Sequence, residues 1–283
     1  MYRRCTERPF EPIRLVVRTV IVPPVTDHAE LFTRATTAVV DSLGPAPDDV
    51  DIPAVKRTSK TLAGRIDHTL LKPDATLSAI ATLCDEAREH GFASVCVNTR
   101  WVPTAVERLA GSDAMVCTVV GFPLGAMTRL AKAEEARITV AEGADEVDMV
   151  LDIGGLLSGD LAAVYDDILG VVGAARPVPV KVILETSMLT DEQKAIACLI
   201  AARTGAAYVK TSTGFGGGGA TPEDIALMRH MVGDALGVKA SGAVRNHRDA
   251  EKVLHAGADR IGASASIAII GGGSDTGAGA GGY

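Results

Sequence analysis

The chain has 283 residues, of which 47% are hydrophobic, so it can bury a core large enough for one α/β barrel or two smaller domains. Its 28 basic and 35 acidic residues give a net charge of −7, which argues against general binding to nucleic acids or anionic membranes, because both need a basic face. No apolar run reaches the roughly 18 residues of a membrane span.

The cysteines and histidines carry information about compartment and cofactors. Five cysteines, an odd number without a C-x-x-C pair, are typical of reduced thiols and predict a cytoplasmic location. The histidines form no pair at metal-ligand spacing, so the sequence predicts no metal site.

Residues 1–57 are interpreted as a partly helical N-terminal extension. Four prolines lie between Pro9 and Pro24, a helical pattern runs from Asp27 to Leu43, and Pro45 and Pro47 begin a linker. We expect a loosely ordered arm or a helix packed outside the main domain. A dimer contact is the alternative, and the sequence leaves open whether the chain forms a homodimer.

From residue 58 onward, strand and helix signals alternate eight times, and several of the helices begin at a Ser, Thr or Asp cap and end in Gly. Eight βα units with strands too apolar to face water predict a TIM (β/α)8 barrel over residues 58–270. A doubly wound open sheet is the alternative, but no G-x-G-x-x-G follows the first strand. The predicted strands are Ile66–Leu70, Ser94–Val97, Met115–Gly121, Glu146–Leu151, Val180–Glu185, Tyr208–Thr211, Val238–Ser241 and Arg260–Ala263.

Two of these strands carry a lysine near the carboxyl end. In the stretch YVKTSTGF (residues 208–215) a buried strand delivers Lys210, followed by three hydroxyl residues and a glycine-rich run, and VKASG (238–242) repeats the pattern with Lys239. A lysine at the end of a buried strand is costly unless its charge is removed or used. Solvation at the rim is the plainer alternative, but two such lysines on successive strands favour a function.

The two lysines also favour a particular chemistry. Neighbouring strands lie about 4.8 Å apart, and two ammonium groups about 5 Å apart repel by roughly 3 kcal/mol at an effective dielectric near 20. This repulsion lowers the pKa of one lysine of the pair, which then provides a neutral amine able to attack a carbonyl carbon. The physical argument does not choose between Lys210 and Lys239.

Five motifs occur together along the chain: IDHTLLKP (66–73), EVDMV (146–150), KVILET (181–186), VKTSTGF (209–215) and VKASGAVR (238–245). Together they resemble the deoxyribose-phosphate aldolases, a family of class I, Schiff-base aldolases. The resemblance covers roughly residues 58–270. It implies a lyase on a TIM barrel, without metal or organic cofactor, that reversibly cleaves 2-deoxy-D-ribose 5-phosphate to D-glyceraldehyde 3-phosphate and acetaldehyde.

The resemblance assigns the nucleophile to Lys210, a proton-relaying role to Lys239 and proton transfer to Asp148. Strand alternation places Asp148 and Glu146 on one face, and the alternative for Asp148 is a structural ion pair, for which Lys181 is available. Further residues expected to line the lumen or mouth and bind substrate are Asp67, Thr69, Cys96 and Lys181. Among these, Asp67 is expected to hydrogen-bond with the lysines, and Cys96 to act as a wall residue.

The phosphate of the sugar substrate is expected at backbone N–H groups and helix starts that follow the last three strands. Tight turns are the plainer explanation for the glycines there. Ala243 replaces a glycine common in the family, which matters only if its φ is positive, and Asp152 stands where the family often has Asn. The candidate residues are Thr213, Gly214, Gly242, Ala243, Arg245 and Ser264.

Residues 271–283 are rich in Gly, Ser and Ala and are predicted to form a flexible tail. The terminal Tyr283 carries a phenol that could reach the enamine carbon, as in some members of the family, and we predict that it shuttles a proton there. A tail without function is the alternative.

Two other functions are alternatives to the aldolase. One is a different lysine-dependent barrel enzyme, such as a transaldolase-like enzyme or one that holds pyridoxal phosphate, which the paired K-x-[TS] strands fit less well. The other is a non-catalytic phosphosugar-binding protein, which would be favoured if Lys210, Lys239 or Asp148 were missing.

Overall fold

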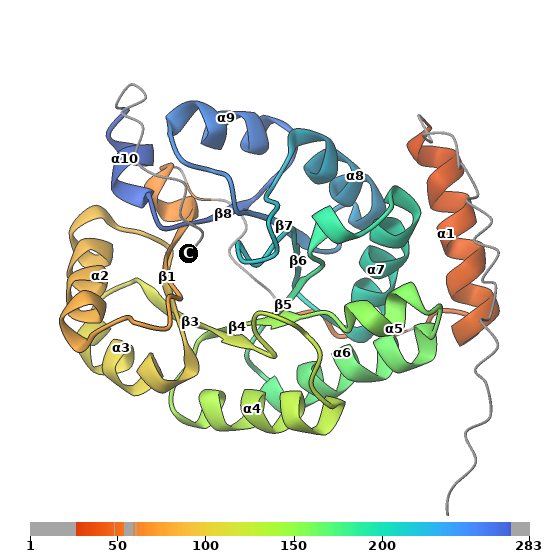
Figure 1. The fold of residues 1–283 in the computed structure, drawn as a ribbon, viewed down its shortest axis with the longest axis horizontal. Helices are drawn as coiled ribbons and strands as arrows, with labels where there is room; N and C mark the ends of the chain where they lie inside the picture. Colours follow the sequence, from red (N-terminus) through yellow and green to blue (C-terminus); the bar gives the residue numbers. More distant parts are fainter. Residues whose placement is uncertain (1–26, 48, 54–58, 60, 273–283) are drawn as a thin grey trace, which may run out of the picture.

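The eight predicted strands pair in parallel and in chain order, and β1 closes onto β8 to form a barrel (Figure 1). This closed parallel pairing confirms the predicted TIM barrel. The computed structural model describes residues 27–47, 49–53, 59 and 61–272. The strands are β1 (Ile66–Leu70), β2 (Ser94–Val97), β3 (Met115–Val120), β4 (Glu146–Val150), β5 (Val180–Ile183), β6 (Tyr208–Lys210), β7 (Gly237–Ser241) and β8 (Arg260–Ala263).

Helices surround the strands as an outer ring (Figure 1). Threonine side chains cap several of them: Thr76, Thr128 and Thr221 each accept a hydrogen bond from a backbone N–H in the first turn, and Thr190 forms a full capping box. The ring consists of α2 (Leu77–His90), α3 (Val102–Leu109), α4 (Arg129–Ala141), α5 (Ile153–Leu157), α6 (Leu161–Ala175), α7 (Asp191–Thr204), α8 (Pro222–Val232), α9 (His247–His255) and α10 (Ser266–Ile270).

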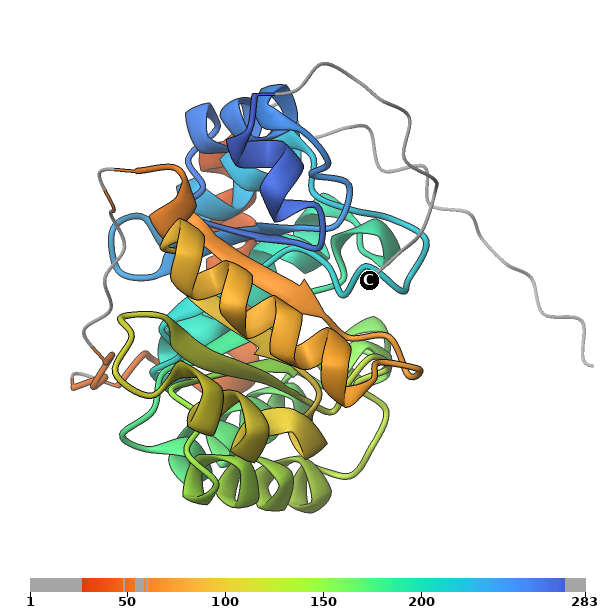
Figure 2. The same cartoon turned by 90° about the vertical axis from the view of Figure 1, so that its left-hand side faces the viewer.

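Four predicted strands extend one or two residues too far at their carboxyl ends. The apolar pattern continues past the last paired residue, but the backbone leaves the extended conformation, for example at Gly121 (φ 65°) and Glu185 (φ 57°). These turns start the loops that follow the strands. Because all strands are parallel, these loops gather at one end of the barrel, to the right in Figure 2.

The main hydrophobic core lies between the strands and the helix ring. Outward-facing strand residues such as Val95, Val147 and Val209 belong to it and are fully buried. Because side chains alternate across a strand, the neighbours of these residues face the lumen, and many of them are charged. The barrel thus has an apolar outside and a polar inside, which creates a place for chemistry.

The helix expected in the N-terminal extension is α1 (His28–Leu43), and it packs outside the ring against α7 (Figure 1). It buries Leu31, Ala35 and Val39, and Arg34 forms an ion pair with Glu192 at 2.6 Å. Residues 1–26 and the tail from residue 273, including Tyr283, lie outside the described residues. None of the helices in the described ranges combines the length and apolar character needed to cross a membrane.

Candidate active site

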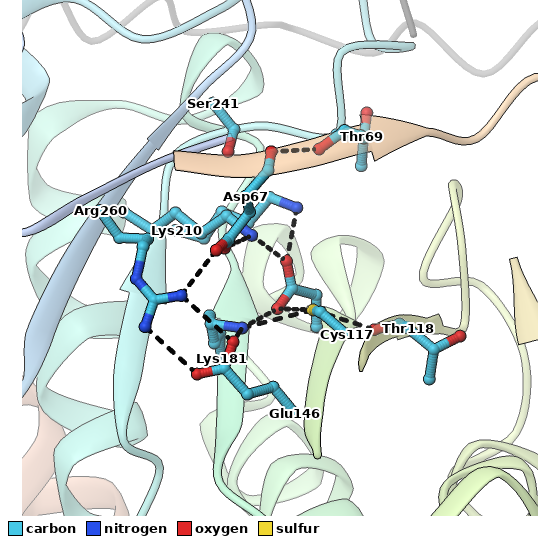
Figure 3. A network of polar contacts seen from close by, with 12 residues as sticks. Asp67, Thr69, Cys117, Thr118, Glu146, Lys181, Lys210, Ser241 and Arg260 are labelled. Atoms are coloured by element: carbon cyan, nitrogen blue, oxygen red, sulfur yellow. Dashed lines mark hydrogen bonds and ion pairs between the residues drawn. The ribbon is translucent and has the colours of Figure 1, made fainter. Parts of the chain in front are cut away.

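Charged side chains from six strands meet in the lumen and form one connected network of ion pairs (Figure 3). Each of them is at most 3% exposed. Groups this deeply buried are tolerated only when they are paired. The members are Asp67 (β1), Glu146 and Asp148 (β4), Lys181 (β5), Lys210 (β6), Lys239 (β7) and Arg260 (β8).

Asp148 is the centre of this network because it contacts all three lysines. Its Oδ1 accepts a hydrogen bond from Lys181 Nζ at 2.8 Å, and its Oδ2 accepts from Lys210 Nζ at 2.8 Å and Lys239 Nζ at 2.7 Å. Burial alone would raise the pKa of Asp148, but the three ammonium groups hold it well below its usual value. Asp148 is therefore a carboxylate at neutral pH.

Asp67 joins the network from the opposite side, as expected from the sequence. Its two carboxylate oxygens lie 2.6 Å from Lys239 Nζ and 2.6 Å from Arg260 Nη1. Arg260 also contacts Glu146 at 3.4 Å. Gly262 on β8 leaves room for this arrangement, because a Cβ atom there would come within 3.0 Å of Lys239 Cε.

Lys210 and Lys239 are direct neighbours in the register of β6 and β7, as predicted. The expected repulsion between them is offset by the Asp148 carboxylate, which lies between the two ammonium groups. Burial acts to lower the pKa of Lys239, but Asp148 and Asp67 outweigh it and raise that pKa. The argument from repulsion did not include these two carboxylates, which keep the proton on Lys239.

Lys181 differs from Lys210 in how its donors are used. Its Nζ contacts Glu146 Oε2 at 2.8 Å, Asp148 Oδ1 at 2.8 Å and Cys117 Sγ at 3.4 Å, which uses all three N–H groups of an ammonium. The sequence placed Lys181 among the substrate-binding residues, but in this structure its donors are occupied by protein groups. Its contact with Asp148 is the ion pair that the sequence offered as the alternative role of that carboxylate.

Lys210 has more freedom. In the described part of the chain Asp148 is its one hydrogen-bond and ion-pair partner, so two of its three N–H groups remain available. It is 3% exposed, whereas Lys181 and Lys239 are fully buried. The loop that follows it becomes exposed from Phe215 onward, so Lys210 lies close to the mouth.

The charges in this network do not balance. Four cations (Lys181, Lys210, Lys239 and Arg260) meet three carboxylates (Asp67, Glu146 and Asp148), which leaves one positive charge in excess when all are ionised. A buried uncompensated charge is costly. The network therefore favours either loss of a proton from one lysine or the arrival of an anion.

Two cysteines lie beside Asp148. Cys96 and Cys117 are fully buried, and their sulfur atoms lie within 4.8 Å of each other and of an Asp148 oxygen. These three atoms are the one group of metal-ligating type found among residues 27–47, 49–53, 59 and 61–272. A divalent cation would meet the ammonium groups that already contact Asp148, so electrostatic repulsion disfavours a metal here.

At the mouth, Glu185 fixes the loop that follows Lys210. Its Oε2 accepts hydrogen bonds from the backbone N–H of Thr213 at 3.2 Å and from the Thr213 hydroxyl, and Thr213 Oγ1 accepts from Phe215 N at 3.0 Å. Gly216 passes so close that a Cβ atom there would lie 2.7 Å from Glu185 Cδ. The Thr213 hydroxyl thus donates its proton to Glu185 and positions the turn at Gly214.

The other predicted phosphate-site residues lie on neighbouring loops at the same rim. Gly242 and Ala243 follow β7, Ser264 follows β8, and Ser264 and the Arg245 side chain are exposed. Behind Ser264, the fully buried Ser266 contacts His68 Nδ1 at 2.9 Å. These loops lie on neighbouring strands, because β6, β7 and β8 are adjacent in the barrel.

Ala243 has a positive φ of 62°, the condition under which its methyl group matters. A non-glycine residue in the left-handed region costs about 1–2 kcal/mol, while a glycine adds about 0.5–1 kcal/mol of unfolded-state entropy. We therefore expect Ala243→Gly to raise the free energy of unfolding by about 0.5–1 kcal/mol in denaturant titrations. Ala256→Gly, at a helix end with φ −73°, is the control and should lower it.

Several residues of the site were not selected from the sequence. Arg260 opens an otherwise apolar strand, and an arginine in a buried strand is the signal that could have identified it. Cys117 gave no comparable signal, because its partners Asp148 and Lys181 are distant in sequence. Asp152, expected to add charge near the mouth, caps α5 by accepting a hydrogen bond from Gly155 N at 3.0 Å.

Comparisons with known proteins identify the family of the chain. Residues 61–281 match the family model described as DeoC/LacD family aldolase. A deoxyribose-phosphate aldolase from Brevibacillus brevis is 58% identical over 214 residues, which cover 76% of this chain and 97% of that protein. The tetrameric deoxyribose-phosphate aldolase structure from Aeropyrum pernix is 31% identical with a TM-score of 0.70, covering 87% of this chain and 97% of that one.

Proposed function

The chain belongs to the DeoC/LacD family of aldolases, and from this we propose that it reversibly cleaves 2-deoxy-D-ribose 5-phosphate to D-glyceraldehyde 3-phosphate and acetaldehyde through a Schiff base on Lys210. The observation that carries the proposal is the state of Lys210. Among the described residues it has one partner for three N–H groups, whereas Lys239 has two partners and Lys181 has three. It is also the one lysine of the network that is not fully buried.

The charge count supports a neutral amine at this position. Loss of one proton from Lys210 leaves three cations against three carboxylates, so the network is balanced while the nucleophile is formed. The neutral Lys210 then attacks the C1 aldehyde of the open-chain sugar. Lys239 keeps its proton because Asp148 and Asp67 raise its pKa.

Asp148 and Lys239 then carry the proton transfers. Asp148 Oδ2 lies 2.8 Å from Lys210 Nζ and 2.7 Å from Lys239 Nζ, so a proton can pass along this line to the carbinolamine hydroxyl, which leaves as water. In the imine, loss of the C3 hydroxyl proton breaks the C2–C3 bond and sends its electrons to the iminium nitrogen. Protonation of the resulting enamine and hydrolysis release acetaldehyde.

A trapping experiment tests the proposal. Acetaldehyde and borohydride should reduce the imine to a stable ethyl adduct, and peptide mapping should find it on Lys210. An adduct found on Lys181 or Lys239 would contradict the assignment. Without any adduct or cleavage, the chain would instead match the non-catalytic phosphosugar-binding alternative.

We expect Lys239→Met to slow cleavage by about 10²-fold or more at neutral pH, because its removal lets the remaining cations balance the three carboxylates and so favours a protonated Lys210. Raising the pH should recover part of the rate. The pH–rate profile checks this, with Lys252→Met, an exposed lysine on α9, as the control. A profile identical to that of the unmodified protein would contradict the charge-balance argument.

The rim loops are proposed to bind the phosphate through Gly214, Gly242, Ala243, Arg245 and Ser264. We expect Ser264→Ala to raise the KM for deoxyribose 5-phosphate several-fold, because a hydrogen bond to a charged group contributes about 1.5–3 kcal/mol, and to leave unphosphorylated deoxyribose nearly unaffected. Steady-state kinetics with both sugars provide the comparison. Equal losses for both would show that Ser264 maintains the loop and does not bind phosphate.

Three further proposals follow from the sequence. Asp67, Thr69 and Cys96 line the lumen and are proposed to contact the sugar. Tyr283, which lies outside the described ranges, is proposed to transfer a proton to the enamine carbon. The cysteine pattern favours a cytoplasmic location.

A further inference from the structure

Cys96 and Cys117 stand opposite each other on neighbouring strands. The register of β2 and β3 pairs their Cα atoms directly, and both side chains face the lumen, where Cys117 Sγ contacts Asp148 Oδ1 at 3.2 Å. They form a small cluster with Leu71 and Val119 that is separate from the main core. Two thiols are thus held side by side inside the site.

The curvature of the barrel brings these side chains together. Adjacent strands lie about 4.8 Å apart, and in a closed eight-stranded barrel neighbouring strands turn toward each other by about 45° on the inner face. Lumen-facing Cβ atoms therefore converge to roughly 4 Å, within the range of about 3.5–4.5 Å that a disulfide requires. The two sulfur atoms already lie within 4.8 Å of each other.

The surroundings of the pair favour reaction at Cys96. The neighbouring Cys117 thiol and the nearby charges of Lys239 and Lys210 lower the pKa of the Cys96 thiol against the effect of burial. Cysteines outside the lumen differ, since burial raises the pKa of Cys84 to about 11.

We propose that Cys96 and Cys117 are a peroxide-sensitive pair that closes to a disulfide inside the active site. The Cys96 thiolate attacks hydrogen peroxide, which breaks the O–O bond and gives a sulfenic acid and hydroxide. The Cys117 thiol then displaces the sulfenic hydroxyl as water and forms the S–S bond. Overall, two thiols are oxidised and one peroxide is reduced to two waters.

The route for peroxide rests on the proposed function, because an aldehyde that reaches Lys210 enters the same lumen and is larger than peroxide. The disulfide would remove the S–H group that contacts Asp148 and would disturb the 3.4 Å contact of Cys117 Sγ with Lys181. Both partners belong to the network that holds the Lys210 amine. We therefore expect oxidation to slow cleavage by about tenfold or more.

Mass mapping of the full-length protein tests the proposal. The protein is treated with hydrogen peroxide, then denatured in the presence of iodoacetamide, which alkylates free thiols, and without reductant. Digestion with trypsin places Cys96 in peptide 89–100 and Cys117 in peptide 109–129. We expect these two peptides to become linked as activity falls, and dithiothreitol to reverse both changes. Unlinked peptides after inactivation, whether Cys96 is unmodified or a sulfinic acid, would overturn the proposal.

Two variants provide further tests. For each variant, the activity after peroxide treatment is compared with the activity of the same variant before treatment. In Cys117→Ala the sulfenic acid has no partner, so peroxide should convert Cys96 to a sulfinic acid and dithiothreitol should no longer restore activity. Cys198→Ala, which removes a buried thiol of α7, should keep the reversible loss. Full reversibility in Cys117→Ala would contradict the pairing. Borohydride trapping at Lys210 is measured separately, so trapping without a disulfide overturns this inference alone.

Discussion

Replacing Lys210 with leucine is expected to abolish both the borohydride-trapped adduct and aldol cleavage, with a rate loss of at least about 10⁴-fold. Lys210 is proposed to form the covalent bond to substrate, and no other lysine of the network can replace it. Lys181 has all three N–H groups occupied, and Lys239 is held between two carboxylates. Adduct yield by mass spectrometry and the cleavage rate should fall together.

The fold should survive this substitution, because leucine removes the excess positive charge of the network and leaves three cations against three carboxylates. We expect a midpoint of thermal unfolding close to that of the unmodified protein. Lys252→Leu, at an exposed position on α9, is the matched control and should keep activity and adduct. An adduct at full yield in Lys210→Leu would move the nucleophile to another residue.

Asp148→Asn is expected to lower both the rate and the stability. The rate should fall by about 10²–10⁴-fold, because an amide cannot pass protons between Lys239 and the carbinolamine. The free energy of unfolding should fall by about 3–5 kcal/mol, because three buried ammonium groups lose their shared carboxylate. Single-turnover kinetics and denaturant titration measure the two effects.

The stability loss should depend on pH in a defined direction. The pKa of Asp148 in the folded protein lies well below its ordinary value of 3.8, so the stabilisation is fully present above about pH 4 and is lost as the pH falls further. The difference in unfolding free energy between the unmodified protein and Asp148→Asn should therefore be constant near neutrality and shrink in acid. A difference that grows in acid would contradict this electrostatic role.

The Glu146→Gln variant tests whether Asp148 transfers protons or only balances charge. Glu146 pairs with Lys181 and Arg260 and has no contact with Lys210, so its removal leaves the same number of unpaired charges as Asp148→Asn. We expect it to destabilise the protein but to slow cleavage less than Asp148→Asn. If both variants slow cleavage by the same factor, Asp148 only balances charge. A selective rise in KM for Asp148→Asn would instead give it a binding role.

The sequence by itself determined the architecture and the chemical candidates, because both depend on local patterns. The βα alternation predicted the barrel, because each strand signal is followed by a helix signal. Lys210 and Lys239 were visible as charged residues in buried strands, and parallel pairing made them neighbours. Strand ends were less certain, because the apolar pattern continues past the turns at Gly121 and Glu185.

The tertiary structure alone decided how these residues share their charges. Asp148 contacts lysines 33, 62 and 91 residues away, and Arg260 reaches Asp67 across 193 residues, and no local pattern encodes such contacts. Only the closed barrel showed that Lys181 has three partners and Lys210 one, a difference that repulsion between two lysines could not predict. It also brought Cys117 beside Cys96, because curvature turns the inner faces of neighbouring strands together.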